Sequence, residues 1–405
     1  MHLGRGPARG GAGGGEQLGV AIKVGRGASA PPFMVMDVIA AANARAAELP
    51  PGAPRILRME VGQPGTGAPA GARAAAAAAL GGADPMGYTE ALGRASLRAR
   101  IAGHYANWYG AEVPAARVAV TMGASAAFPL AFLAAFDPGD RVALAAPFYP
   151  PYVNILVALG LVPIVVETGP ETRYQPTPAL LDRLDPPPDG LIVASPCNPA
   201  GTMLAPAELQ ALCAWCDARG VRMVSDEIYH GLHYTRPIST AVAFSDTAVV
   251  INSFSKYFSM TGWRVGWMVL PADLVRPVEC LAQNLFISAP YISQVAAEAA
   301  FDCTAELEGN VAGYRRSREA LLAALPGAGF PDVAAADGAF YIYADLGGRT
   351  NDSVAFCARM LAEAGVAASS GVDFDRARGH RTVRLSYCGA EADMREAAVR
   401  LTGWR

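Results

Sequence analysis

Between residues 117 and 270, short apolar runs alternate with spans in which apolar residues recur at helical spacing. The short runs predict strands at 117–120, 141–146, 162–167, 190–195, 221–226, 248–253 and 265–270. Helical spans at 124–136, 150–159 and 206–219 separate several of them. Because strands that alternate with helices form parallel sheets covered on both faces, this region predicts an α/β fold with a mainly parallel sheet flanked by helices.

The two ends of the chain show a different pattern. Residues 31–48 begin with prolines and then predict a helix, and residues 90–110 predict a longer helix that ends at Gly110. After about residue 285, helices accompany two further strand candidates, 337–346 and 382–388, which predict a small α+β domain. The expected organisation is a leader without fixed structure (1–27), an N-terminal segment joining the small domain (28–62), a large domain (63–285) and a small C-terminal domain (286–405).

Composition and charge narrow the class of protein. The chain has 405 residues, of which 52% are hydrophobic and 17% charged, enough apolar material for a large core. A formal net charge of −3 gives no reason to expect nucleic acid or an anionic membrane as a partner. The apolar stretches stop well short of a membrane span, and the N-terminus lacks the apolar segment of a secretory signal. Seven irregularly spaced cysteines are typical of a reducing compartment, so we expect a cytoplasmic protein.

Lysine is unusually rare in this sequence. Of the 33 Lys and Arg residues, only Lys23 and Lys256 are lysine. A coding bias toward Arg, Ala and Gly accounts for the imbalance, but an amine can deprotonate and attack a carbonyl carbon whereas a guanidinium cannot. Lys23 lies in the glycine-rich leader and Lys256 follows a strongly apolar run, which makes Lys256 the candidate for covalent chemistry.

Polar side chains gather where four of the predicted strands end. Ligands of open parallel sheets bind at the carboxyl ends of the strands. The strand at 117–120 is followed by TMGAS and a helix. The other three ends carry an amide, a carboxylate, a phenol, two hydroxyls and an amine, which belong to Asn198, Asp226, Tyr229, Ser253, Ser255 and Lys256.

This set of groups suits a phosphorylated aldehyde. The amine of Lys256 would form an imine, and the carboxylate of Asp226 would keep a ring nitrogen protonated, so that the ring becomes an electron sink. The N-terminus of the predicted helix at 124–136, together with Ser125, would hold a phosphate. Ser253, Ser255 and Arg264 would add donors and a fixed positive charge.

Several motifs make a resemblance specific. SFSKYFSMTGWRVGW (253–267) resembles the lysine signature of class I aminotransferases, which are pyridoxal-phosphate enzymes of fold type I. SPCNPAGT, SDEIY and VRLSY are similar to other landmarks of that family and follow in the family's order. VGQPGTGAP (61–69), GYTEALGRASLR (87–98) and GAFY (338–341) extend the resemblance from about residue 30 to the end.

The resemblance implies a role for each matching residue. Lys256 would hold pyridoxal 5'-phosphate and carry the proton during catalysis, with Asp226 on the pyridine nitrogen and Tyr229 as a further catalytic residue. Tyr229 and Asn198 would bind the phenolic oxygen, and Tyr149 would stack on the ring. The phosphate would be bound by Ala124 (through its amide), Ser125, Ser253, Ser255 and Arg264, and by Tyr88 from the second subunit of a homodimer. Arg384 would bind the substrate α-carboxylate, in a site that Gly62, Asn198 and Phe340 line.

The reaction that the resemblance implies is a ping-pong transamination through pyridoxamine phosphate. An L-amino acid would give its amino group to the cofactor, and a 2-oxo acid, expected to be 2-oxoglutarate, would take it. Position 125 is a serine where an aspartate-specific bacterial subgroup carries a lysine nearby. Phe33, Met34, Tyr149 and Phe286 suggest an apolar or mixed pocket, so the amino donor stays open between aspartate and alanine, aromatic or other neutral amino acids.

Three alternatives keep part of this pattern. A carbon–sulfur lyase or cyclase on the same fold would keep every cofactor residue and differ in its products. A non-enzymatic pyridoxal-phosphate-binding regulator would need a DNA-binding domain, and only about 30 residues precede the matching region. A catalytically inactive relative is disfavoured by the presence of Lys256, Asp226 and Arg384.

Two further motifs resemble redox or metal sites, but we interpret both as purely structural. CAWC (213–216) has the spacing of a redox pair but lies in a helical span, without a second pair for zinc. His230 and His233 have an HxxH spacing without an evident third ligand. We therefore expect neither a redox site nor a metal site.

Overall fold

The computed structural model describes residues 22–29, 31–32 and 34–404. Most of the leader that we expect to lack fixed structure, and also Phe33, lie outside the described residues. Across the end of the leader, Arg26–Ser29 form a short 3-10 helix, η1, which contacts α5 (Pro151–Ala158).

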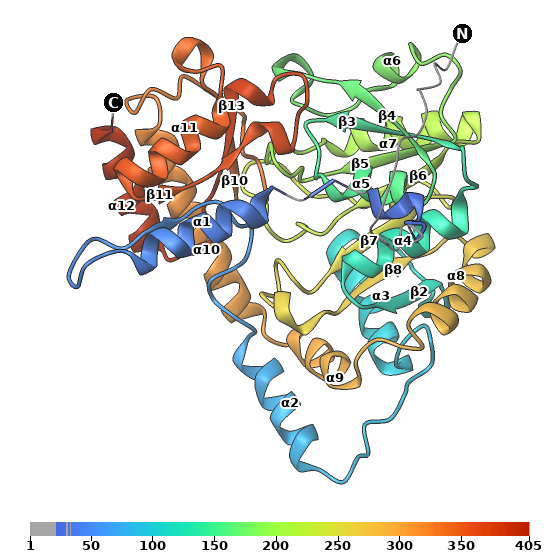
Figure 1. Ribbon diagram of the computed structural model, residues 1–405. Coiled ribbons are helices and arrows are strands. Elements are labelled where there is room, and N and C mark those ends of the chain that lie inside the picture. Colours follow the sequence, from blue (N-terminus) through green and yellow to red (C-terminus); the bar gives the residue numbers. More distant parts are fainter. Residues whose placement is uncertain (1–21, 30, 33, 405) are drawn as a thin grey trace, which may run out of the picture.

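The central feature is a seven-stranded sheet in the order β2-β8-β7-β6-β5-β3-β4 (Figure 1). Its strands are β2 (Val118–Thr121), β3 (Arg141–Ala146), β4 (Val162–Glu167), β5 (Gly190–Ala194), β6 (Arg222–Asp226), β7 (Val249–Ser253) and β8 (Gly266–Val269). Strands β3 to β7 pair in parallel, and β8 runs antiparallel to β2 and β7. The seven predicted strands and the mainly parallel sheet are thus confirmed.

Helices cover both faces of this sheet, which is why most of its strands are apolar throughout. Helices α4 (Ala124–Ala135), α5 and α8 (Ala272–Leu285) share one core with the sheet. Helices α3 (Ala95–Tyr109) and α7 (Pro206–Arg219) pack on the other face, and the short α6 (Pro178–Leu181) lies against α7. Helix α3 begins five residues later than predicted, because residues 90–93 form a turn in which Gly93 takes a φ of 90°.

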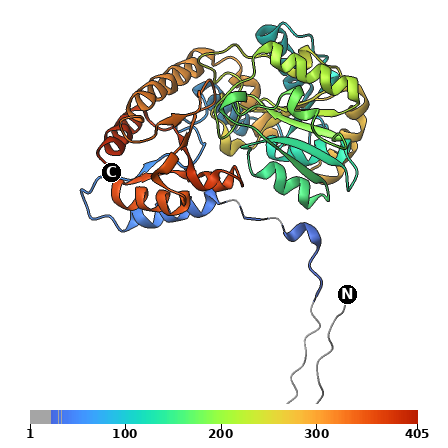
Figure 2. The ribbon, with the colours of Figure 1, turned by 90° about the horizontal axis from the view of Figure 1, so that it is seen from above.

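The C-terminal part forms a smaller α+β layer beside the large sheet (Figure 2). A four-stranded antiparallel sheet has the order β12-β13-β10-β9. Its strands are β9 (Asp332–Val333), β10 (Tyr341–Asp345), β12 (Ser369–Ser370) and β13 (Thr382–Ser386). Its helices are α10 (Thr304–Ala324), α11 (Ser353–Arg359) with a π-turn at Met360–Ala364, and α12 (Glu391–Gly403).

The N-terminal segment joins this C-terminal part. Strand β1 (Leu57–Arg58) pairs in parallel with β11 (Val366–Ala367). Helix α1 (Val35–Ala47) buries Ala42 against Ile56 and Leu361. The small α+β layer is therefore built from both ends of the chain, with α1 lying along it (Figure 1).

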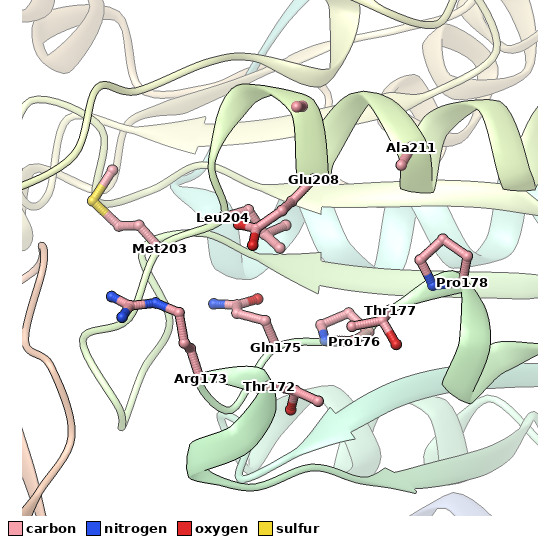
Figure 3. Close-up of a pocket in the computed structure, with 11 residues that line it drawn as sticks. Thr172, Arg173, Gln175, Pro176, Thr177, Pro178, Met203, Leu204, Glu208 and Ala211 are labelled. Carbon is pink, nitrogen blue, oxygen red and sulfur yellow. The ribbon is translucent and has the colours of Figure 1, made fainter.

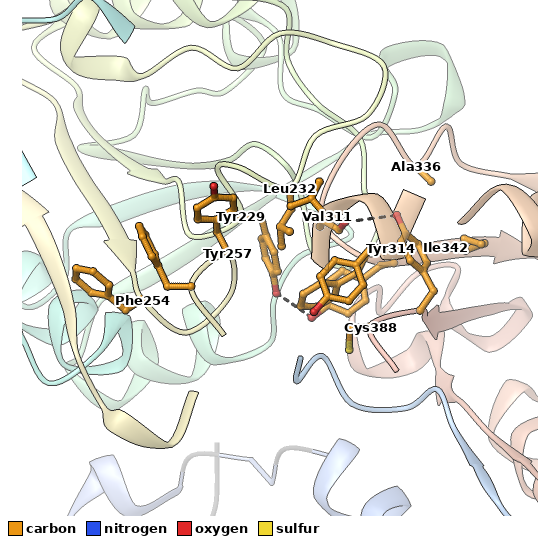
Figure 4. Packing of buried hydrophobic residues seen from close by; sticks show 14 of the residues in the cluster. Tyr229, Leu232, Phe254, Tyr257, Val311, Tyr314, Ala336, Ile342 and Cys388 are labelled. Atoms are coloured by element: carbon orange, nitrogen blue, oxygen red, sulfur yellow. Dashed lines mark hydrogen bonds between the residues drawn. The ribbon is translucent and has the colours of Figure 1, made fainter. Parts of the chain in front are cut away.

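The two parts of the molecule share one hydrophobic core. Figure 4 shows side chains from the loops after β6 and β7 meeting those of α10, β10 and the segment after β13 in this core, among them Tyr229, Leu232, Tyr257, Val311, Tyr314, Ile342 and Cys388. Helix α2 (Ala70–Gly81) projects from this body beside α9 (Tyr291–Ala300) (Figure 1). Among the described residues, no helix is both long and apolar enough to cross a membrane.

Candidate functional site

Polar side chains from several strand ends line a cavity of about 850 Å³, which we call the main cavity. Strands β5, β6 and β7 end at Ala194, Asp226 and Ser253, and their carboxyl ends lie at one edge because the strands are parallel. The loops that follow these strands carry Asn198, Tyr229 and Lys256 into the cavity wall. The sheet topology thus assembles groups that are far apart in the sequence.

Lys256 is partly buried in this wall. Its Nζ donates a hydrogen bond to the carbonyl oxygen of Gly62 at 2.6 Å and lies 5.8 Å from the ring centres of Tyr229 and Phe340. The pKa of the amine is lowered to about 8, mainly by burial and also by the guanidinium of Arg384, against the opposing effects of Cys388 and Asp226. Near neutral pH a useful fraction of this amine is therefore uncharged, the form that attacks a carbonyl carbon.

Asp226 is a buried carboxylate that faces the main cavity. Its Oδ2 accepts a hydrogen bond from the Tyr152 hydroxyl, and its Oδ1 accepts one from the amide of Ile228 at 3.1 Å. Burial raises the pKa of Asp226 to about 6, although both hydrogen bonds act to lower it. Within the described part of the chain no Arg or Lys forms an ion pair with Asp226, so a cationic N–H in the cavity would stabilise it.

Arg384 is held in a fixed orientation at another wall of the cavity. Its guanidinium lies between the rings of Tyr341 and Phe374, 4.6 Å from each centre. Nη1 donates to Asn198 Oδ1 at 2.9 Å, and Nη2 donates to the Glu60 carbonyl at 2.5 Å and to Ser369 Oγ at 3.2 Å. Its Nε is buried without a partner among the described residues. A stacked guanidinium with an unused donor is suited to a carboxylate.

The start of helix α4 forms a cradle for an anion. Gly123 precedes it with a φ of 71°, and the exposed amides of the first turn belong to Ala124 and Ser125. Arg264 Nη2 donates to Ser125 Oγ at 3.2 Å, and a Cβ at Gly123 would lie 2.6 Å from the same nitrogen. The positive φ favours glycine at position 123, and the absence of a side chain there leaves room for the Arg264 guanidinium.

The two serines of the lysine loop differ in position. Ser255 lines the main cavity, and its Oγ donates to Ser253 Oγ at 2.9 Å. Ser253 is turned away, because its Oγ donates to the Val265 carbonyl at 3.1 Å. In this arrangement Ser253 orients Ser255 and does not itself reach the cavity.

Other predicted residues lie at different distances from the cavity. Tyr149 and Gly62 line it, and a Cβ at Gly62 would overlap the Tyr341 hydroxyl. Phe340 is fully buried behind the cavity wall, where its ring packs on Tyr229. Tyr88 lies on the segment after α2 with 83% of its surface exposed, and it does not line the main cavity of its own chain.

Two tyrosines that contact predicted site residues were not predicted from the sequence. The Tyr341 hydroxyl is 2.8 Å from that of Tyr229, and burial raises both pKa values, Tyr229 well above its usual range. Tyr152 holds Asp226 through its hydroxyl. Tyr341 lies in the GAFY motif, and Tyr152 lies in PFYPPY (147–152), the segment that also contains Tyr149, but neither segment indicates which aromatic ring faces the site.

The CAWC motif and the His230–His233 pair lie among closely packed side chains. Cys213 and Cys216 are buried in α7, and burial raises the pKa of both thiols, that of Cys213 to about 12. His230 Nε2 donates to the Ser195 carbonyl at 3.0 Å, and its Nδ1 accepts from the Tyr109 hydroxyl at 2.7 Å. Across the described ranges, no cluster of three or more His, Cys, Asp or Glu side chains could hold a metal ion.

A smaller cavity of about 270 Å³ lies behind the loop that carries Asn198 (Figure 3). Its polar groups are engaged in holding that loop. Gln175 Nε2 donates to the carbonyls of Ala194 and Thr202 at 3.2 and 3.1 Å, and Arg173 pairs with Asp337. We therefore assign these residues to positioning the loop.

Comparisons with known proteins agree with this geometry. The family described as aminotransferase class I and II matches residues 54–401. Valine–pyruvate aminotransferase of Mycobacterium tuberculosis is 49% identical over 93% of this chain and 97% of that protein. Aspartate/prephenate aminotransferase of Thermus thermophilus is 32% identical over 89% of this chain and 94% of that protein. The crystal structure of an aminotransferase from Mycobacterium tuberculosis superposes with a TM-score of 0.92 at 48% identity, covering 95% of this chain and 99% of that one.

Proposed function

The chain belongs to the class I and II aminotransferase family, and on that premise we propose that it transfers the amino group of valine or a similar aliphatic amino acid to pyruvate, using pyridoxal 5'-phosphate held on Lys256. The proposal keeps the ping-pong order expected from the sequence. It differs from that expectation in naming an aliphatic donor and in naming pyruvate as the acceptor.

The distribution of charge in the main cavity carries the substrate assignment. Its charged lining residues are Asp226, Lys256, Arg264 and Arg384. The proposal gives each of them a task on the cofactor or the substrate α-carboxylate, so the described lining of the main cavity holds no further cation for a second carboxylate. The remaining wall is largely apolar, with side chains from α1, α4, α5 and the loop after β6: Val35, Met36, Phe128, Pro151, Ile155 and Ile228. An aliphatic side chain fits this wall better than a carboxylate does.

The small number of charged residues in the main cavity also bears on the identity of the amino-group acceptor. 2-Oxoglutarate would bring a second carboxylate into the apolar wall, whereas pyruvate brings only a methyl group. The relative that is 49% identical is named for valine and pyruvate. These two points support pyruvate over the 2-oxoglutarate expected from the sequence.

The residues present fit pyridoxal phosphate. Asp226 is buried without an ion pair in the described chain, as a partner of a protonated ring nitrogen should be. The first turn of α4 with Arg264 offers amides and a fixed positive charge for a phosphate. Lys256 lies in the same cavity with a lowered pKa. Bound there, the cofactor would supply a sink for the electrons released at the substrate Cα.

The chain's own groups would then orient the substrate and move one proton. Arg384, fixed between two rings, would bind the α-carboxylate through its unused donors. Lys256 Nζ would take the proton from Cα as a general base, which its pKa of about 8 allows near neutral pH. Asp226 would hold a proton at the ring nitrogen, and Tyr152 would keep that carboxylate ionised.

We also propose that the enzyme is a homodimer in which Tyr88 reaches the second subunit's phosphate site. Tyr88 is 83% exposed, and Leu80, Leu285 and Ile287 are exposed apolar side chains. Light scattering of the purified protein should give twice the mass of the chain. Tyr88→Phe should weaken cofactor binding without changing that mass.

Product analysis with defined substrate pairs tests the function. Valine with pyruvate should give alanine and 3-methyl-2-oxobutanoate in equal amounts, at a higher kcat/KM than aspartate with 2-oxoglutarate. With a β-substituted sulfur amino acid as the substrate and no oxo acid added, release of pyruvate, free ammonia and a thiol would instead indicate a lyase. A preference for aspartate and 2-oxoglutarate would overturn the substrate assignment while leaving the aminotransferase activity in place.

A further inference from the structure

A separate cavity of about 360 Å³, which we call the α3 cavity, lies beside the segment that follows Lys256. It shares no lining residue with the main cavity. One face of helix α3 forms a wall, with Arg100, Gly103, His104, Asn107 and Trp108 at helical spacing. Tyr257 and Phe258, the two residues after Lys256, also line it, so the α3 cavity lies against the chain segment that carries the proposed catalytic lysine.

His104 lines the α3 cavity without a hydrogen-bond partner among the described residues. It is only 7% exposed, and its ring lies 4.2 Å from that of Trp108 and 5.3 Å from that of Phe301. Burial lowers its pKa to about 4, so the imidazole is neutral at physiological pH. A neutral imidazole has one donor and one acceptor nitrogen, and buried polar groups are normally paired. Since His104 lines the cavity, a ligand there can form a hydrogen bond with this imidazole.

Gly103 keeps the α3 cavity open. It lies in the interior of α3, where glycine is less favourable than alanine. A Cβ at this position would meet nothing within 4 Å, so the space above it belongs to the cavity. A side chain added here should fill the cavity without displacing neighbouring atoms.

Opposite charges lie at the exposed side of the α3 cavity. Arg100 Nη2 forms an ion pair with Asp302 Oδ1 at 2.5 Å, and both side chains are well exposed. The guanidinium also lies 5.7 Å from the centre of the Phe301 ring. An exposed ion pair contributes little to stability and can exchange its partners for those of a ligand. A zwitterion would match both charges.

We propose that the α3 cavity binds a free aromatic amino acid whose ring carries an N–H or O–H donor. The ring packs in the cavity against the side chains of Trp108 and Phe301 that line it and donates its hydrogen bond to His104. The ammonium group binds Asp302, and the carboxylate binds Arg100. Because Tyr257 and Phe258 form part of the wall, the bound ligand contacts the chain next to Lys256 from outside the main cavity.

Calorimetric titration of the cofactor-loaded Arg384→Leu variant tests this site, because that variant lacks the substrate carboxylate clamp of the main cavity. L-Tryptophan should bind saturably at one site per chain. 1-Methyl-L-tryptophan, which lacks the ring N–H, should bind about three- to tenfold more weakly, the usual worth of one neutral hydrogen bond.

Variants of α3 separate binding in this cavity from binding elsewhere. In the Arg384→Leu background, Gly103→Phe should abolish L-tryptophan binding, and Gly103→Ala, the matched control, should retain it. His104→Phe should weaken L-tryptophan binding and leave that of 1-methyl-L-tryptophan unchanged. Absence of saturable binding, or full binding by the Gly103→Phe variant, would overturn the proposal. Thermal unfolding of Gly103→Phe beside Gly103→Ala shows whether the variant is folded.

Discussion

The two sides of the main cavity are built by different means. On one side, groups at the ends of β5, β6 and β7 are fixed by hydrogen bonds, as in the contact of Lys256 with the Gly62 carbonyl and that of Arg384 with Asn198. On the other side, Val35 and Met36 of α1 and Ile155 of α5 contribute an apolar surface. The polar side is specified atom by atom, whereas the apolar side is specified by volume and by the absence of charge. The first should therefore tolerate almost no substitution, and the second should change substrate preference gradually.

The largest effect should come from Lys256. Lys256→Ala removes the amine that attacks the cofactor and moves the substrate proton, so the single-turnover rate should fall by about 10⁴-fold or more. Lys23→Ala is the matched control, since Lys23 is exposed and far along the chain from the site. If Lys256→Ala kept more than a tenth of the rate, the polar side would not depend on the amine.

The second largest effect is expected from substitution of Arg384. Arg384→Leu removes a charge-assisted clamp, so kcat/KM for valine should fall by roughly 100-fold, about 3 kcal/mol. Arg359→Leu, which removes an exposed arginine paired with Glu363, should leave kcat/KM unchanged. Equal losses in the two variants would show that Arg384 does not bind the substrate carboxylate.

Tyr152→Phe should produce a smaller, pH-dependent effect. The Tyr152 hydroxyl lowers the pKa of Asp226, which burial raises to about 6. Cofactor affinity should fall as the pH drops below about 6, because protonated Asp226 cannot pair with a cationic ring nitrogen. Without the hydroxyl the pKa rises, so this loss should begin at higher pH, by roughly one pH unit. Equilibrium titration of pyridoxal phosphate at several pH values measures the shift, and an unchanged pH profile would contradict it.

The smallest effect should come from the apolar side. Met36 is 59% exposed, so Met36→Arg adds a cation near the substrate without disturbing the core. The ratio of kcat/KM for aspartate to that for valine should rise about fivefold, because the new charge favours a second carboxylate. Met36→Gln, similar in length but uncharged, should leave the ratio near its original value. A fall in the ratio with Met36→Arg would mean that Met36 does not face the substrate.

Most residues on the polar side of the main cavity could be predicted from the sequence. Asn198, Asp226 and Lys256 follow apolar runs directly, and parallel strands bring such ends together whatever the rest of the chain does. Most of the strand positions were predicted because a strand buried on both faces is apolar throughout, and the edge strand β4 was predicted from its run of valine and isoleucine.

The contacts that depend on the direction of a side chain could not be predicted from the sequence. Tyr149 and Tyr152 lie three residues apart in PFYPPY, and only the folded turn shows that Tyr152 holds Asp226. Ser253 carries the same hydroxyl as Ser255, but backbone packing turns it toward Val265. The apolar wall comes from helices far apart in the sequence, and any helix with an apolar face could have supplied it.

Chemical trapping of the cofactor lysine tests the central claim most directly. The chain contains two lysines, Lys23 and Lys256, which serve as each other's control. Borohydride reduction of the protein after incubation with pyridoxal phosphate, followed by peptide mass spectrometry, should add one phosphopyridoxyl group to the peptide containing Lys256 and none to that containing Lys23. Labelling of Lys23 alone, or of neither lysine, would contradict the assignment of Lys256 and with it the proposed chemistry of the main cavity.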